Sequence, residues 1–435
     1  MCLLPVLAGL ALGCAERPPS PPIERILLVT VDTLRADHVG AYGELSLTPA
    51  IDALAAEGVV LLEACTPTPS TGPAHASLFT GRYPWHHGVL ENATLLGGEP
   101  PVLAELLRER GFATAAFVAS FIVDERFGFA RGFDHYHFDP TESYTWRGRP
   151  QGRFWSRADR VAAATLEWLA EHRDEPFFVW VHLFDPHSPY RPEPGMRRDE
   201  PVDLTGKRVP PGVADGEELR ELIRAYRGEV RYADAQLGRL TEGLVELGLL
   251  DSTAVVVTSD HGEGLGDHGL LEHGTNLHDE LVRVPLVIRA PGLPAGRRLR
   301  GAAQLEDLAP TLLALAGAPV PEGMDGLDLG PWLAGRRDDS PRDAVLGRRR
   351  RYPKAPDLYF VRDGNEKWIG TPRRGRRYDL EADPRERRGR RDPELPPELR
   401  GALAAEPAAG ERVLDAETEA ALRALGYLEE EPRDP

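Results

Sequence analysis

A dense group of carboxylate and imidazole side chains follows an apolar run that ends at residue 259. Six of them lie within twenty residues: Asp260, His261, Asp267, His268, His273 and His278. Carboxylate beside imidazole suits a divalent cation such as Mn²⁺ or Zn²⁺, whereas an all-oxygen shell would suit Ca²⁺ or Mg²⁺ better. A single histidine would most often be an incidental surface residue. This density, interleaved with glycines that let backbone approach an ion closely, indicates a metal site or a phosphoryl or sulfuryl site.

Residues 65–75, which read CTPTPSTGPAH, offer candidate nucleophiles. They include Cys65, Ser70 and Thr71, and a threonine hydroxyl attacks well only when a metal or a base lowers its pKa. Thr71 stands just before Pro73 and the helix-forming run AHASLFT, whose positive end would favour a nearby anion. By residue type alone, Thr71 could equally be an ordinary helix N-cap.

Three aspartates stand where predicted strands end. The apolar runs at 26–31, 177–184 and 253–259 are followed directly by Asp32, Asp185 and Asp260. One aspartate after a strand is usually a turn or cap residue. In open α/β sheets, however, ligands bind at the carboxyl ends of the strands. Three such ends, joined by the histidine-rich segment, therefore predict one shared site.

The surrounding pattern predicts the fold class. Helices are expected at 49–57, 102–110, 157–172 and 217–247. The last three are followed by apolar strands at 112–118, 177–184 and 253–259, and 284–290 is a further expected strand. Alternating strands and helices predict an α/β fold with a mainly parallel central sheet and helices on both faces. We assign residues 23–330 to this domain.

The character of the chain changes at residue 331. The segments DAVLG, DLYFVRDG and EKWIGT predict short strands of a small antiparallel sheet, so we assign 331–430 to a C-terminal subdomain. Arginine clusters between 348 and 391 contain interspersed acidic residues. They are interpreted as solvated loops.

The net charge and the N-terminal sequence limit the kinds of partner and the location that we expect for this protein. The chain has 435 residues and a formal net charge of −17, which argues against nucleic acid because phosphate binding needs a basic face. Residues 1–22 contain an apolar run that is too short to span a bilayer and ends in LALGC before a Pro/Ser-rich linker. They fit a lipoprotein-like signal segment with Cys14 lipidated. We expect an exported protein, either periplasmic or membrane-anchored through Cys14 alone.

Ordered motifs over residues 24–429 resemble the sulfatase family within the alkaline phosphatase superfamily. They are ILLVTVDTLRADHVGAYG, ASLFTGRYP, YRGEVRYADAQLGRL, SDHGEGLGDHG with HGTNLHDELVRVPLVIRAPG, and the later LEDLAPTLLALAG, YDLEADPRE and ALGYL. The resemblance implies that Asp32, Asp260 and His261 bind a metal. One aspartate after the first strand, and His261 where many members have Asn, favour Mn or Zn over Ca or Mg.

The resemblance also implies roles for three further residues. His187, in DPHSPY, resembles a histidine that contacts the substrate or protonates the leaving group. Asp185 beside it is a candidate extra metal ligand. His273 matches a position where many sulfatases place a basic residue on the substrate oxyanion, and where two-metal phosphodiesterases place a metal-binding histidine.

The family's nucleophile is a cysteine in C-x-P-x-R that is oxidised to formylglycine. Aligning ASLFTGRYP puts that cysteine on Thr71, the proline on Pro73 and the arginine on His75. Cys65 lies six residues too early, and Ser70 is out of register by one. We therefore expect Thr71 to be the nucleophile and a metal contact, with His75 in the catalytic set and no formylglycine.

Together these features predict a metal-dependent hydrolase that cleaves a sulfate or phosphate ester through Thr71. A threonine ester cannot expel its group as formylglycine hydrate does, so the resolving attack falls on sulfur or phosphorus, which favours phosphoester or phosphodiester chemistry. The substrate would be a small, glycan-linked or lipid-linked anionic ester. Three alternatives stay open: a sulfuric ester hydrolase without formylglycine, a phosphoryl-type transferase, and an inactive lipid-anchored binding protein.

Overall fold

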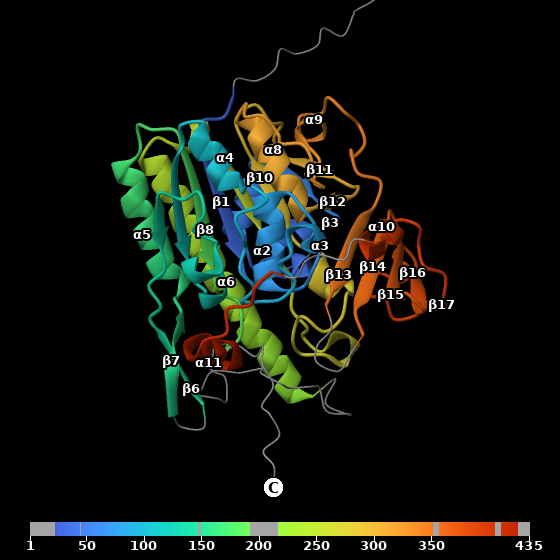
Figure 1. The fold of residues 1–435 in the computed structure, drawn as a ribbon. Coiled ribbons are helices and arrows are strands. Elements are labelled where there is room, and N and C mark those ends of the chain that lie inside the picture. Colours follow the sequence, from blue (N-terminus) through green and yellow to red (C-terminus); the bar gives the residue numbers. More distant parts are fainter. Residues whose placement is uncertain are drawn as a thin grey trace, which may run out of the picture.

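A central sheet of eight strands forms the scaffold of the molecule, seen in the computed structural model of Figure 1. The structure describes residues 22–43, 45–146, 149–191, 216–350, 356–404 and 410–424. The expected signal segment and Cys14 lie outside these ranges. Across the sheet the strands are β11 (Arg297–Leu299), β2 (Val59–Leu61), β10 (Leu286–Arg289), β9 (Thr253–Thr258), β1 (Arg25–Val31), β8 (Phe177–Leu183), β4 (Ala113–Val118) and β5 (His135–His137).

The sheet is mainly parallel, as the alternating pattern predicts. β1 pairs in parallel with both β8 and β9, and β4 pairs in parallel with β8 and β5. β10 is the exception, because it runs antiparallel to β9 and β2. The three central strands are buried almost throughout, which explains their continuous apolar sequences.

Helices cover both faces of this sheet (Figure 1). On one side α1 (Pro49–Glu57) and α5 (Ala158–Glu171) each contact α6 (Glu217–Glu246). On the other side α2 (Thr71–Thr80), α4 (Leu103–Glu109) and α8 (Leu308–Leu315) contact one another. Short helices are α3 (Pro84–His87), α7 (Asp279–Val282), α9 (Gly330–Leu333), α10 (Leu399–Ala404) and α11 (Ala416–Ala424). No helix in the described ranges is long and apolar enough to span a membrane.

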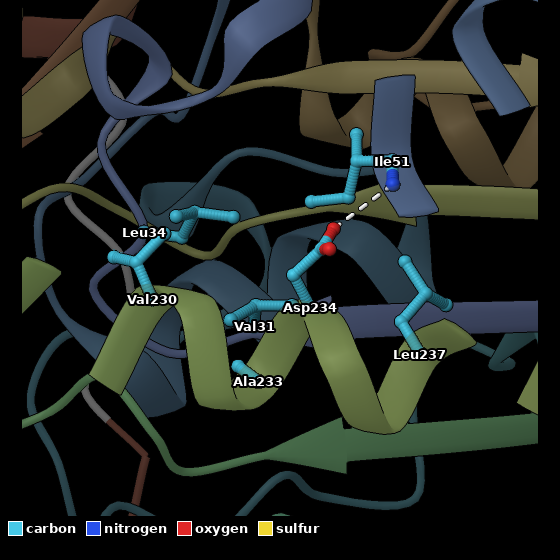
Figure 2. A pocket seen from close by; sticks show the side chains of 7 residues that line it. All are labelled: Val31, Leu34, Ile51, Val230, Ala233, Asp234 and Leu237. Carbon is cyan, nitrogen blue, oxygen red and sulfur yellow. Dashed lines mark hydrogen bonds between the residues drawn. The ribbon is translucent and has the colours of Figure 1, made fainter. Parts of the chain in front are cut away.

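One aspartate fastens two of these helices together. Asp234 on α6 accepts hydrogen bonds from the backbone N–H groups of Ala50 and Ile51, at 3.0 and 2.9 Å, in the first turn of α1. It lies at the edge of a small apolar pocket whose other lining residues come from β1 and its following turn, α1 and α6 (Figure 2). Burial raises the pKa of Asp234 to about 6. The carboxylate satisfies helix N–H groups that would otherwise lack acceptors.

The C-terminal region forms the expected small antiparallel sheet, but with more strands. Its order is β13 (Val345–Arg349), β14 (Leu358–Asp363), β15 (Glu366–Thr371), β16 (Arg374–Asp379) and β17 (Arg390–Asp392). The interpretation of the arginine clusters as loops is wrong for β16 and β17. Arg377 pairs with Glu366 and Asp392 on the two neighbouring strands, at 2.7 and 2.8 Å, so the interspersed acids serve as cross-strand partners.

Two minor pairs complete the strands. They are β3 (Ala64–Cys65) with β12 (Ala303–Gln304), and β6 (Glu142–Trp146) with β7 (Arg149–Trp155).

Candidate active site

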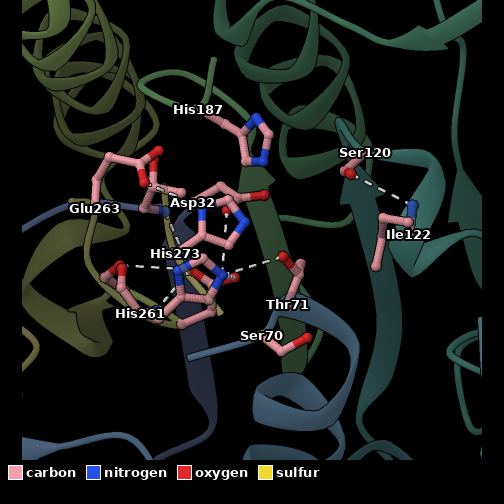
Figure 3. Close-up of polar contacts among 12 residues, drawn as sticks. Asp32, Ser70, Thr71, Ser120, Ile122, His187, His261, Glu263 and His273 are labelled. Atoms are coloured by element: carbon pink, nitrogen blue, oxygen red, sulfur yellow. Dashed lines mark hydrogen bonds and ion pairs between the residues drawn. The ribbon is translucent and has the colours of Figure 1, made fainter. Parts of the chain in front are cut away.

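Three ligand-type side chains converge where β1 and β9 end. Thr30 pairs with Thr258 in the parallel register, so Asp32 and Asp260, two residues further on, leave the sheet side by side. Asp32, Asp260 and His261 each offer a ligand atom, and these atoms lie within 4.8 Å of one another. Figure 3 shows Asp32 and His261 together with the hydroxyl of Thr71. The expected meeting of the strand ends is confirmed for this group.

The carboxylates of Asp32 and Asp260 are buried and have no counter-charge among the described residues. Asp32 and Asp260 are each 1% exposed. Both oxygens of Asp32 and Oδ2 of Asp260 lack a hydrogen-bond donor within the described residues. In the same ranges neither carboxylate is paired with a lysine or arginine. Burial, together with the nearby charges of Asp260 and Glu263, holds the pKa of Asp32 well above its usual range. A divalent cation would supply the missing charge.

The tautomer of His261 is suited to the same purpose. Its Nδ1 lies 2.9 Å from the carbonyl oxygen of Gly262, which can only accept, so Nδ1 carries the proton. Nε2 then presents a lone pair toward the carboxylates, 3.4 Å from Oδ2 of Asp260 and 4.0 Å from Oδ1 of Asp32. Burial also lowers the pKa of His261, which keeps the ring neutral. One imidazole nitrogen and two carboxylates form a donor set that fits a divalent cation.

The hydroxyl of Thr71 faces this group. Thr71 is the first residue of α2, and its Oγ1 lies 3.3 Å from Nε2 of His261. Ser70 takes the N-cap position, and its Oγ donates to Oδ1 of Asn92 at 3.1 Å. Asn92 also accepts from the N–H of Gly72 at 2.8 Å, which fixes the first turn of the helix. Of the two hydroxyls, the one of Thr71 lies at the metal-ligand group.

His75 lies beneath this turn and is fully buried. Its Nδ1 donates to the carbonyl oxygen of Thr71 at 2.8 Å, and its Nε2 lies 3.0 Å from Oγ1 of Thr30. Thr30 also accepts from Nε1 of Trp180 at 3.0 Å. Both imidazole nitrogens are therefore used inside the protein. These contacts hold α2 on the sheet, and the place of His75 in the catalytic set stays a prediction.

His273 and His187 lie next to the metal-ligand group. The His273 ring lies 4.4 Å from the His261 ring and 5.1 Å from the His187 ring, centroid to centroid. Nδ1 of His273 contacts Oε1 of Glu263 at 3.2 Å, and Nδ1 of His187 contacts the carbonyl oxygen of Ser188 at 2.6 Å. Burial lowers the pKa of both histidines to about 4 and raises that of Glu263 to about 7. Both expected residues are thus at the site.

Asp185 is not part of the metal-ligand group. Its Oδ2 accepts from the N–H of Ala158 at 2.9 Å, and its Oδ1 pairs with Arg157. Arg157 also pairs with Glu229 at 2.7 Å. The aspartate therefore ties the loop that carries His187 to the start of α5, and an arginine takes the place that a metal would need.

Three residues of the histidine-rich segment also lie apart from the group. Asp267 pairs with Arg35 at 2.8 Å. The rings of His268 and His278 stack at 3.7 Å, and Glu280 contacts Nδ1 of His268 at 2.9 Å. These contacts fasten the segment to its surroundings, so the density of ligand types in the sequence overstates the size of the metal site.

Cys65 is a buried core residue of β3. It is fully buried and packs in an apolar cluster with Leu277, Leu281 and Phe360. Burial raises the pKa of its thiol to about 11. The thiol is therefore a poor nucleophile in this position.

A strained turn after β1 is held by a tyrosine that the sequence reasoning missed. Thr33 adopts φ +54°, which is unfavourable for a β-branched residue. Its N–H donates to Oδ1 of Asp260 at 3.2 Å. Tyr226 on α6 donates its hydroxyl to the carbonyl oxygen of Thr33 at 2.9 Å and accepts from the N–H of Arg35 at 3.0 Å.

Tyr226→Phe should therefore destabilise the protein by about 1–3 kcal/mol, because two buried backbone groups lose their partner. Urea denaturation measures this difference, and the half-buried Tyr232 on the same helix provides the control Tyr232→Phe. Equal stability of the Tyr226 variant and the wild type would show that the turn does not depend on this hydroxyl.

Glu263 and Asn92 were also missed. Glu263 lies in the quoted SDHGEGLG run, but its contact with His273 joins residues ten positions apart through a loop without regular periodicity. Asn92 lies twenty residues from Gly72, and no pattern links the two. The only signal for Glu263 was a carboxylate next to the predicted ligands.

Family models match most of the chain. A model described as Sulfatase matches residues 24–318, and a model described as N-sulphoglucosamine sulphohydrolase, C-terminal, matches residues 266–400. The first covers more than half of the sequence. The second spans part of the histidine-rich segment and all five strands of the C-terminal sheet.

Individual relatives agree with these models. The chain is 28% identical over 359 residues to an ulvan-active sulfatase from Formosa agariphila, with 76% of this chain and 69% of the relative covered. It is 28% identical to the multifunctional alkaline phosphatase superfamily protein PehA from Trinickia caryophylli, with 72% and 77% covered. The crystal structure of a phosphonate monoester hydrolase from Agrobacterium radiobacter matches with a TM-score of 0.69 and 26% identity, over 85% of this chain and 91% of that one.

Proposed function

The chain belongs to the sulfatase family of ester hydrolases, and from that premise we propose that it cleaves a phosphoester or phosphodiester through Thr71 with the help of a divalent cation. One observation carries the proposal: Oγ1 of Thr71 lies 3.3 Å from Nε2 of His261, within the buried group that has no counter-charge among the described residues. The hydroxyl therefore stands where a nucleophile in contact with a cation would stand.

The cation would be held by Asp32, Asp260 and His261, and its chemistry would be to lower the pKa of the Thr71 hydroxyl and to neutralise the anionic ester. A nitrogen ligand beside two carboxylates favours Mn²⁺ or Zn²⁺. Thr71 also begins α2, so the first-turn N–H groups of that helix and its positive end lie next to the reacting group.

The reaction then proceeds in two displacements. In the first, Thr71 gives its hydroxyl proton to His273 or His187, Oγ1 forms a bond to phosphorus, the bond from phosphorus to the leaving oxygen breaks, and the histidine passes the proton to that oxygen. In the second, water gives a proton to the same histidine and attacks phosphorus, the bond to Thr71 breaks, and the Thr71 oxygen takes the proton back. Figure 3 shows both histidines in one group of side chains with Thr71, where they could exchange this proton.

Phosphorus is favoured over sulfur for a chemical reason. A threonine ester can be resolved only by attack at its central atom, and metal-assisted attack of that kind is familiar for phosphoryl groups. The similarity to a phosphonate monoester hydrolase supports the same choice. The similarity to an ulvan-active sulfatase supports the second candidate, a sulfuric ester hydrolase that works without formylglycine.

Parallel assays separate these candidates. Purified protein supplied with Mn²⁺ is tested on an aryl sulfate, an aryl phosphate monoester and an aryl phosphodiester. We expect kcat/KM to be highest for one of the phosphorus esters. A preference for the aryl sulfate would replace the proposal by the second candidate. Turnover only when an acceptor alcohol is present would indicate a transferase, and no turnover together with no bound metal would indicate a binding protein.

Substitution of Glu263 tests the proton-transfer step separately. Its carboxylate accepts from Tyr190 at 3.3 Å and from the N–H of Gly264 at 3.1 Å, which holds it against His273. Glu263→Gln should lower kcat by about 10–100-fold, because the imidazolium of His273 loses its carboxylate partner. The loss should be larger for poor leaving groups, which need the proton most. Equal losses for all leaving groups would point to a general structural defect.

A further inference from the structure

Among the buried histidines of the described residues, one has no hydrogen-bond partner for either ring nitrogen. His182 on β8 is fully buried in the sheet, and neither of its ring nitrogens has a hydrogen-bond partner within the described residues. Buried polar groups in proteins are almost always satisfied, because an unmade hydrogen bond in the interior destabilises the fold. A histidine with two such nitrogens in a core strand therefore calls for a partner.

The group that faces His182 is Asp32. Thr30 pairs with His182 in the parallel register of β1 and β8, which puts the side chain of Asp32 one step beyond on the same face. Nε2 of His182 lies 3.6 Å from Oδ2 of Asp32. On the other side, the ring of His75 lies 5.1 Å away, and both of its nitrogens are already bonded to Thr30 and Thr71.

The two oxygens of Asp32 face different neighbours. Oδ2 is the oxygen that faces Nε2 of His182, whereas Oδ1 faces Nε2 of His261 at a distance of 4.0 Å. Both oxygens lack a hydrogen-bond donor in the described ranges. The separation of 3.6 Å is too long for a hydrogen bond, and a small rotation of the carboxylate or the ring would close it.

We propose that His182 is the positioning residue of the metal site: its Nε2–H donates to Oδ2 of Asp32 and directs Oδ1 toward the cation. The inference rests on the proposed function, because it needs a cation at Asp32, Asp260 and His261. Carboxylates that bind metals are in turn held by hydrogen bonds, and such outer partners typically contribute 10–100-fold to metal affinity. A neutral imidazole suffices for this donor.

Titration calorimetry of Mn²⁺ into the metal-free, full-length protein tests this directly. His182→Leu should weaken the Kd by about 10–100-fold while the stoichiometry stays unchanged. His182→Gln should stay closer to the wild type, because its amide N–H can still donate to Asp32. His87→Leu is the matched control: His87 is another buried histidine, but its nitrogens are bonded to Ser77 and to the N–H of Val89. The Kd of His87→Leu for Mn²⁺ should equal that of the wild type.

The outcomes are distinct. Equal Kd values for the wild type and His182→Leu overturn the inference and leave the proposed function standing. No Mn²⁺ or Zn²⁺ binding by the wild type overturns the metal site itself, and the inference with it. If His182→Leu does not fold, as judged by its circular dichroism, His182→Met takes its place with the same expected loss of affinity.

Discussion

Replacing Thr71 by alanine is expected to lower kcat/KM by roughly 10³-fold or more, because removing the nucleophile of a covalent mechanism removes most of its rate enhancement. The hydroxyl is the only part of Thr71 that the proposed reaction uses, so Thr71→Ser should keep a substantial fraction of the activity. The measurement is steady-state kinetics on the best aryl ester of the substrate panel. The alanine variant should bind Mn²⁺ and unfold at a temperature close to that of the wild type.

Two control variants test whether the loss of activity is specific to position 71. Thr80 is a buried threonine on the same helix, and its hydroxyl donates only to the carbonyl oxygen of Ala76 at 2.7 Å. Thr80→Ala should therefore retain activity. Cys65→Ala should also retain activity, with a modest loss of stability from the emptied volume. Loss of turnover in the Cys65 variant, with turnover kept in the Thr71 variant, would assign the nucleophile to the cysteine and refute the register argument.

Quenched reactions give an independent view of the same step. Wild-type protein mixed with a fast-leaving phosphodiester should accumulate a modified peptide that contains Thr71, detectable by mass spectrometry after acid quench. An initial burst of the leaving group would accompany it. A modified Ser70 would move the assignment by one residue. The hydrogen bond from Ser70 to Asn92 makes that outcome unexpected.

The scaffold of the site could be predicted because strong local patterns specify it. A strand buried on both faces must be apolar throughout, so the positions where Asp32 and Asp260 end such strands are visible in the sequence. Parallel pairing then forces these ends together, which is a consequence of topology and needs no knowledge of side-chain contacts.

The finer chemistry could not be predicted because it depends on tertiary partners. Asp185 has the same sequence context as Asp32, yet Arg157 reaches it from the start of α5 and takes the place of a metal. His75 occupies a position suggestive of catalysis, but the direction of its ring depends on how α2 packs over Thr30. A pattern of residue types carries no information on these directions.

A second large effect is expected at Asp32. Asp32→Asn should abolish Mn²⁺ binding and activity, yet should stabilise the metal-free protein by about 1–3 kcal/mol, because a buried charge without a partner is removed. The folded-state pKa of Asp32 is raised, mainly by burial. For an acid, a raised folded pKa means that ionisation costs stability at every pH above the unfolded value of about 3.9. The cost shrinks as the pH falls below the folded pKa, so the advantage of the variant should be larger at pH 7 than at pH 4.

Thermal unfolding with and without Mn²⁺ measures both effects in one series. A ligand at one hundred times its Kd stabilises the wild type by about 2.7 kcal/mol, whereas the variant should show no shift. Asp234→Asn is the matched control, because Asp234 is also a buried acid but uses both oxygens to accept N–H groups of α1. Asp234 lies outside the metal-ligand group, so this variant should keep the Mn²⁺ shift.

The stability of metal-free Asp32→Asn decides what kind of carboxylate Asp32 is. A structural carboxylate stabilises the fold that contains it, so its removal must weaken the protein whether or not a cation is present. A carboxylate that serves to bind a ligand lowers the stability of the ligand-free protein, because its charge is buried without compensation until the ligand binds. Lower stability of metal-free Asp32→Asn, with an unchanged Mn²⁺ shift, would place Asp32 in the first class and remove the cation from the site. Higher stability with no shift would mean that the protein keeps Asp32 at the expense of its own fold, which only binding of a cation explains.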